Sequence, residues 1–308
     1  MPSNWWETTF PQGQQSLIIP DATGREVKIA YGEKGTGQPL LLVHGIGSWS
    51  YSWRHLIDPL AQSFRVICVD LKGNGFSDKP QQIEPIGHEI IELQRVIRAL
   101  CDQPVILIAQ SLGALISLGL VEEYPQLCEK MVLINVPIFL DTLPSWWMPA
   151  IARLPFSLIQ WFDQARLSKP LAPLIREITR FSRRELVTDP SLITLEDVYW
   201  ITYPYIEFPG AIAQYGQALQ QACREIESLV QQKPNTIRNI QAKLPQITQP
   251  TLLLWGDQDH WFPLPQGKTL QQALPNAQLQ ILPNCGHDAA ASCPQPILEA
   301  LTPFLPLP

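Results

Sequence analysis

The fold of this 308-residue chain is decided by the stretch VILIAQSLG, residues 105–113. Its opening apolar run shows no alternation, which is typical of a strand buried on both faces of a sheet. The run leads directly into Ser111, and a helical pattern follows. A serine on so sharp a turn needs small neighbours two positions away, here Ala109 and Gly113, because larger side chains would clash. We therefore expect the turn to lift the Ser111 hydroxyl above the edge of the sheet.

Strand-like and helix-like segments alternate along most of the chain. Besides Val105–Ala109, the segments expected to form strands are Ser16–Pro20, Glu26–Tyr31, Leu40–Val43, Val66–Asp70, Met131–Val136, Thr251–Trp255 and Gln278–Leu282. The segments expected to form helices are Ser52–Gln62, Glu84–Leu100, Ser111–Glu123 and Gln266–Ala273. Strands that alternate with helices predict an α/β fold with a mostly parallel, doubly wound sheet of about eight strands.

Residues 138–248 interrupt this alternation. They are rich in Trp, Phe, Tyr and Pro and contain 11 Lys+Arg and 10 Asp+Glu, a net charge of +1, against 11 − 18 = −7 elsewhere. We predict a helical cap over 138–248, inserted into an α/β core of residues 1–137 and 249–308. Such an insert is where an α/β enzyme builds its substrate pocket, and we expect Trp146 and Trp147 to contact substrate.

The cap segment 145–162 is almost uncharged and has Trp residues near both ends. Tryptophans in such positions are typical of interfacial anchors. The segment is expected to form an apolar lid over the active site, and peripheral contact between the cap and a membrane is a second hypothesis. Two prolines and its modest length argue against a spanning helix.

The composition excludes several functional classes. The chain is 45% hydrophobic and 16% charged, which argues against disorder. A net charge of −6 argues against nucleic acid as a partner. The six cysteines lack zinc-like spacing, and no complete G-x-G-x-x-G is present, so we expect no metal and no cofactor. The N-terminus shows no basic stretch followed by an apolar run, so a cytoplasmic location is expected.

A second loop accompanies the serine turn. The stretch LLLVHGIG, residues 40–47, is a buried strand that ends in a His-Gly loop. This loop can bring the backbone N–H of Ile46 beside that of Leu112. Two such donors form an oxyanion hole. His44 is expected to fix the loop rather than to act as a base.

A serine hydroxyl is a poor nucleophile without a base, and the base needs an acid to hold its tautomer. The strand at 251–255 is followed by an acidic turn with Asp257 and Asp259, and the strand at 278–282 is followed by His287. The order Ser…Asp…His, each at the carboxyl end of a strand, predicts that three side chains converge on one spot.

Five motifs occur together in a fixed order. They are the His-Gly loop at 44–45, Asp70-x-x-Gly73-x-Gly75-x-Ser77-Asp78-x-Pro80, the serine turn at 109–113, Gly256-x-x-Asp259-x-x-x-Pro263 and Gly286-His287. With these motifs the chain resembles α/β-hydrolase-fold serine hydrolases of the esterase and lipase kind over essentially its whole length, apart from the cap.

The resemblance implies Ser111 as nucleophile, His287 as general base and then acid, and Asp259 as the orienting carboxylate. Asp257 is the rival acid, but the spacing from Gly256 favours Asp259. Gln110 stands where His is often found in related esterases and lipases, and it is expected either to line the substrate pocket or to bond a neighbouring loop.

The predicted function is cofactor-free cleavage of a carboxylic ester of a small hydrophobic substrate, with thioesters and lactones as further possibilities. Haloalkane dehalogenases and epoxide hydrolases on this fold need a carboxylate nucleophile, so the serine disfavours both. Two alternatives stay open. One is a hydrolase of carbon–carbon bonds with the same triad, and the other is a ligand receptor on the same fold with slow turnover.

Overall fold

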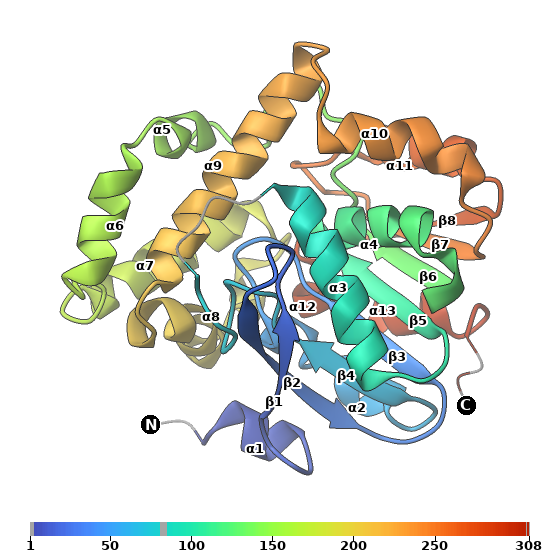
Figure 1. Cartoon of the computed structure of the whole chain (residues 1–308), viewed down its shortest axis with the longest axis horizontal. Helices are drawn as coiled ribbons and strands as arrows, with labels where there is room; N and C mark the ends of the chain where they lie inside the picture. The colour runs from blue at the N-terminus through green and yellow to red at the C-terminus, as the bar shows by residue number, and fades with distance from the viewer. Residues whose placement is uncertain (1–2, 81–84, 306, 308) are drawn as a thin grey trace.

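The computed structural model describes residues 3–80, 85–305 and 307, and its centre is an eight-stranded sheet (Figure 1). The strands are β1 (Gln15–Pro20), β2 (Glu26–Lys34), β3 (Pro39–Val43), β4 (Arg65–Val69), β5 (Val105–Gln110), β6 (Cys128–Ile134), β7 (Thr251–Gly256) and β8 (Ala277–Leu282). Their spatial order is β1-β2-β4-β3-β5-β6-β7-β8. β2 pairs antiparallel with β1 and β4, and the strands from β4 to β8 pair parallel. The predicted α/β fold is confirmed.

Helices cover both faces of the sheet. They are α1 (Trp5–Thr9), α2 (Ile57–Leu60), α3 (Ile86–Leu100), α4 (Leu112–Glu123), α5 (Met148–Ala152), α6 (Phe156–Gln164), α7 (Ala172–Ser182), α8 (Leu195–Glu207), α9 (Ala211–Val230), α10 (Thr236–Lys243), α11 (Leu264–Ala273), α12 (Ala289–Ser292) and α13 (Pro294–Leu301). Leu41 and Val43 of β3 pack on the side of α3 and α4, whereas Leu40 and Leu42 pack with α2 and α13. A strand with an apolar core on each face needs apolar residues at every position.

Two elements differ from the sequence prediction. The helix expected at Ser52–Gln62 is a 3-10 turn, Ser50–Trp53, followed by the short α2. Pro59 lacks the N–H that a longer helix would use. The N-terminal helix α1 was not predicted from the sequence. Its Trp5 and Trp6 are buried and pack against Trp49. Glu84, the expected start of α3, lies outside the described residues.

The segment between β6 and β7 forms helices α5 to α10. The long helix α9 packs against α5 and α6, and α10 packs against α4 on the flank of the sheet. Helices α5 to α9 therefore form a lobe beside the sheet, on the left in Figure 1, and the chain returns to the core at α10. No helix among the described residues is long and apolar enough to cross a membrane.

Gly113, in the first turn of α4, has no room for a side chain. A Cβ atom there would lie 2.6 Å from the carbonyl oxygen of Val43 and against that of His44. We expect Gly113→Ala to lower the free energy of unfolding by about 1–3 kcal/mol, because helix and strand backbone would have to separate. Urea denaturation measures this change. Gly87→Ala in α3 is the matched control, since no atom of the described residues lies within 4 Å of its added Cβ. An equal effect in both variants would contradict the prediction.

Candidate active site

Ser111 occupies a strained turn between β5 and α4. Its backbone has φ +55° and ψ −126°, a conformation that residues with a side chain rarely adopt. The Ser111 N–H donates to the Ile134 carbonyl at 2.9 Å, which fixes the turn to the end of β6. Gly45 allows the second loop to approach, because a Cβ there would lie 3.0 Å from Ser111 Cβ. The turn thus presents the hydroxyl where the sequence predicted it.

The structure brings Ser111, His287 and Asp259 into one hydrogen-bonded series. His287 Nε2 lies 3.1 Å from Ser111 Oγ, and His287 Nδ1 lies 2.9 Å from Asp259 Oδ2. The second carboxylate oxygen of Asp259 accepts from the backbone N–H groups of Trp261 and Phe262 at 2.8 and 2.9 Å. All three side chains are buried. Asp259 is therefore oriented by two backbone donors and can in turn orient the imidazole.

Two aromatic rings enclose the imidazole of His287. The Trp261 ring stacks on it at a centroid distance of 5.1 Å, and the Phe262 ring meets it edge-on at 4.8 Å. Sequence reasoning missed both residues, although their position directly after the acidic turn was the available signal. They restrict the access of water to the base and line the cavity described below.

Asn135 joins the strands that carry the acid and the base. It follows β6 with φ +51° and is fully buried. Its Nδ2 donates to the carbonyl oxygens of Gly286 and His287 at 3.1 and 2.9 Å, and its Oδ1 accepts from the Gly256 N–H at 3.0 Å. One amide thus sets the distance between β7 and the loop that bears His287. Asn135 was not singled out in the sequence analysis.

The predicted oxyanion donors lie next to the nucleophile. Ile46 and Leu112 both line the cavity at Ser111. Within the described part of the chain, neither backbone N–H has a hydrogen-bond acceptor. Both groups are therefore available to an oxygen that carries developing negative charge.

His44 fixes the oxyanion loop, as expected. Its Nε2 accepts from the Leu71 N–H at 3.0 Å, and its Nδ1 lies 2.8 Å from the Gly45 carbonyl oxygen, to which it can donate. Burial lowers the pKa of His44 to about 4. The ring is therefore neutral, and it bridges the loop to the segment after β4.

The other residues singled out in the sequence are placed as follows. The Gln110 amide accepts from the Ala290 N–H at 2.9 Å and reaches Asp288 at 3.4 Å, so it bonds the loop after His287 and does not line the cavity. Trp146 is 84% exposed and does not line the cavity. Trp147 is half-buried against Trp261 but is not part of the cavity wall. Asp257 accepts from the Cys285 N–H and braces its turn.

An apolar cavity extends from Ser111 between core and cap. Its volume is about 60 Å³. Its wall contains Leu115 of α4, Met148 of α5, and Leu219 and Cys223 of α9. Almost no polar surface faces the interior. The cap therefore supplies much of the wall, through residues that the sequence did not single out.

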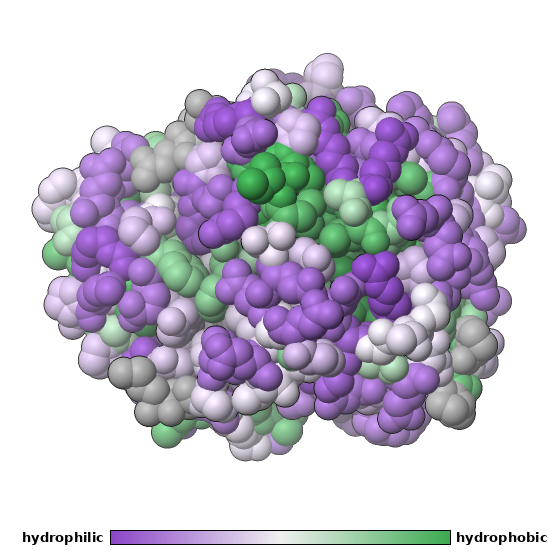
Figure 2. Space-filling view, turned by 60° about the horizontal axis from the view of Figure 1, so that its bottom comes forward, coloured by the Kyte–Doolittle hydropathy of each residue, from purple (hydrophilic) through white to green (hydrophobic). Residues whose placement is uncertain are grey.

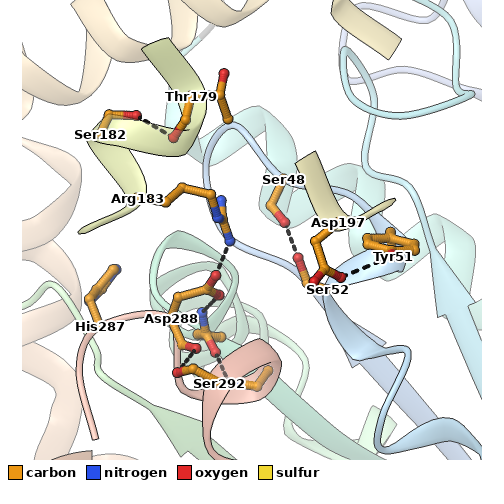
Figure 3. A network of polar contacts seen from close by, with 12 residues as sticks. Ser48, Tyr51, Ser52, Thr179, Ser182, Arg183, Asp197, His287, Asp288 and Ser292 are labelled. Carbon is orange, nitrogen blue, oxygen red and sulfur yellow. Dashed lines mark hydrogen bonds and ion pairs between the residues drawn. The ribbon is translucent and has the colours of Figure 1, made fainter. Parts of the chain in front are cut away.

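A partly buried ion pair joins the cap to the loop that bears His287. Arg183, directly after α7, pairs with Asp288, the neighbour of His287 (Figure 3). The Asp288 N–H also donates to the Leu186 carbonyl at 3.0 Å. These contacts join residues about a hundred positions apart, so no local pattern could have predicted them. They hold the cap segment after α7 against the base.

Within the ranges that the structure describes, no group of three His, Cys, Asp or Glu side chains is arranged to hold a metal ion.

The comparisons with known proteins show the family of this chain. The alpha/beta hydrolase fold family matches residues 38–291, and the chain belongs to that family. Epoxide hydrolase 3 of Xenopus tropicalis is 26% identical, over 97% of this chain and 79% of its own length. A cis-3-alkyl-4-alkyloxetan-2-one decarboxylase of Shewanella oneidensis is 26% identical, over 84% and 79%. A thermophilic esterase from Thermogutta terrifontis shares the fold, with a TM-score of 0.71, 20% identity and coverage of 95% and 98%. Family membership supports hydrolytic activity.

Asn135→Ala tests the amide that joins acid and base. The variant leaves a buried N–H and two carbonyl groups without partners, so we expect it to lower the free energy of unfolding by about 2–4 kcal/mol. Asn284→Ala is the matched control, because Asn284 has the same left-handed backbone, φ +52°, but is exposed. Chemical denaturation measures both. Equal losses of unfolding free energy in the two variants would mean that the effect comes from the backbone conformation and not from the hydrogen bonds of Asn135.

His44 predicts a dependence of stability on pH. Its folded pKa of about 4 lies below the ordinary value of 6.5, so its stabilising effect is complete above pH 6.5 and is lost as the pH falls toward 4. The stability advantage of the wild type over His44→Gln should therefore shrink by about 3 kcal/mol across this range. Denaturation curves of both proteins at several pH values test this. A difference that is constant with pH would contradict it.

Proposed function

We propose that this protein is a serine hydrolase that cleaves a carboxylic ester of a small hydrophobic substrate. The observation that carries the proposal is the hydrogen-bonded series from Ser111 through His287 to Asp259, at 3.1 and 2.9 Å. The series ends at an apolar cavity beside two backbone N–H groups that have no acceptor among the described residues.

The geometry supports an acyl-serine mechanism. His287 Nε2 takes the hydroxyl proton as Ser111 Oγ attacks the ester carbonyl carbon. The carbonyl oxygen becomes negatively charged and accepts from the N–H groups of Ile46 and Leu112. When the tetrahedral intermediate collapses, His287 protonates the leaving alcohol. A water molecule then gives its proton to His287 and attacks the acyl group, which releases the acid and restores Ser111.

The identity of the nucleophile bears on two reactions of this fold, the opening of an epoxide and the displacement of a halide. Opening an epoxide or displacing a halide through a covalent intermediate bonds the enzyme to an sp³ carbon. With a carboxylate nucleophile this intermediate is an ester, which water can hydrolyse at its carbonyl group. With Ser111 it would be an ether, which has no carbonyl group to attack. Serine therefore favours acyl transfer over both of these reactions.

The cavity favours an uncharged acyl group. Its wall is almost entirely apolar, so a charged substituent would lose its hydration without a partner. This argues against substrates that carry a carboxylate next to the reacting carbonyl group. Its limited volume also favours a short acyl chain over a long one.

Hydrolysis of a series of nitrophenyl esters, from acetate to palmitate, tests the proposal. We expect kcat/KM to be higher for butyrate than for acetate, because longer chains bury more apolar surface, and to fall again for palmitate, which exceeds the cavity. Ser111→Ala should reduce kcat by at least about 10⁴-fold. Activity that survives in Ser111→Ala would refute the serine mechanism.

Ala222→Phe tests whether the cavity holds the acyl chain. Ala222 lines the cavity from α9, and a larger side chain there should lower kcat/KM for butyrate by more than about tenfold while acetate is less affected. Ala218→Phe, one turn earlier on α9 and absent from the cavity wall, is the control. An unchanged ratio of butyrate to acetate hydrolysis in Ala222→Phe would place the acyl chain elsewhere.

A further inference from the structure

The outer surface of the cap carries two apolar stripes. On α6, Leu158 and Trp161 are exposed one turn apart, and Leu154 is exposed in the bend before the helix. On α7, Leu174, Ile178 and Phe181 are exposed at positions i, i+4 and i+7, and Phe181 is 70% exposed. Positions with this spacing lie on one face of a helix. Each helix therefore turns a row of large apolar side chains toward solvent.

Such rows are not needed for the packing of the cap. The opposite face of α6 packs on α9, where Ile159 contacts Gly216. Helix α7 packs on α8, with the Arg176 guanidinium over the Tyr199 ring. Exposed apolar rows of this length mark a surface that contacts another molecule when the protein functions.

The same segment is positively charged in an acidic protein. Residues 145–185 contain seven Lys+Arg and three Asp+Glu, a net charge of 7 − 3 = +4, whereas the whole chain carries −6. Arg183 pairs inward with Asp288, and the exposed basic side chains are Arg153, Lys169, Arg180 and Arg184, of which Lys169 pairs with Glu207. Of the three acidic side chains, Asp163 is buried and Glu185 accepts from Ser145, so the exposed one is Glu177. Arg180 and Arg184 are exposed beside Phe181, and Arg184 lies over its ring. Figure 2 shows hydrophobic residues interspersed with hydrophilic ones over the cap at the left.

We propose that the outer face of α6 and α7 binds the surface of an anionic lipid bilayer. Large apolar side chains flanked by Arg are the features by which helices lie in the headgroup region of such membranes. The net positive charge favours an anionic surface, whereas a second copy of this chain would bring two positive faces together.

The position of the stripes connects this face to the cavity. Helix α6 packs on Gly216 of α9, and Leu219, one turn further along α9, lines the cavity. Trp146 is 84% exposed only two residues before Met148, which also lines the cavity. A bilayer at the outer face would lie one helix layer from the cavity. The idea that an apolar ester moves from the lipid to Ser111 rests on the proposed function. The proposed binding to the bilayer does not depend on that function.

Flotation of the full chain with lipid vesicles tests the proposal. We expect the protein to float with vesicles of phosphatidylcholine and phosphatidylserine, to float less with phosphatidylcholine alone, and to be released by high salt. Ile178→Gln/Phe181→Gln should lower the partition coefficient between vesicles and water by more than about tenfold. In the wild type both apolar side chains leave water on binding, and the variant loses this contribution. Arg180→Gln/Arg184→Gln should reduce the preference for phosphatidylserine.

The control is Ile18→Gln/Ile281→Gln, which removes two comparably exposed apolar side chains from β1 and β8. It should bind like the wild type, and circular dichroism should show that both double variants are folded. Absence of flotation by the wild type would overturn the proposal, as would equal binding of the two double variants. A wild-type dimer that the α7 variant abolishes, without vesicle binding, would assign the face to a second copy instead. The assay needs no turnover, so its failure leaves the ester assay unaffected.

Discussion

The arrangement of the active site depends on the buried amide of Asn135. The ends of parallel strands diverge because the sheet twists, and the acid and the base follow two different strands. Asn135 bonds Gly256 at the end of the acid strand and the carbonyl groups of Gly286 and His287 on the base loop. An uncharged residue with all its polar atoms satisfied can do this at the centre of the protein, whereas an unpaired charge there would be costly. The spacing of the triad is thus set by a residue that takes no part in proton transfer.

Core and cap divide the chemistry between them. In the proposed mechanism the core supplies the nucleophile, the base, the acid and the two backbone donors, all at the carboxyl ends of strands, where open α/β sheets hold their ligands. The cap supplies apolar wall residues and touches the base loop through Arg183 and Asp288. Such a division allows the pocket wall to vary while the core groups stay in place.

The sequence predicted all eight strands and the meeting of Ser111, Asp259 and His287, because unbroken apolar runs and tight Gly-containing turns are local signals. It did not predict the cap wall. Trp146 and Trp147 were expected at the substrate, yet Met148 and the α9 residues line the cavity, since the orientation of a short helix depends on packing against distant segments. The same reason applies to Arg183 and Asp288. For Gln110, the residues left two interpretations open, and only the position of Ala290 decides between them.

The central claim is that the acyl group of the ester is transferred first to Ser111 and then to water. Mass spectrometry of the protein, quenched in acid during turnover of nitrophenyl butyrate and digested to peptides, tests this most directly. The account predicts a butyryl group on the peptide that contains Ser111, which disappears once the substrate is consumed and does not form in Ser111→Ala. A butyryl group on another residue that forms and decays at the rate of turnover, or steady hydrolysis by the Ser111→Ala protein, would contradict the account.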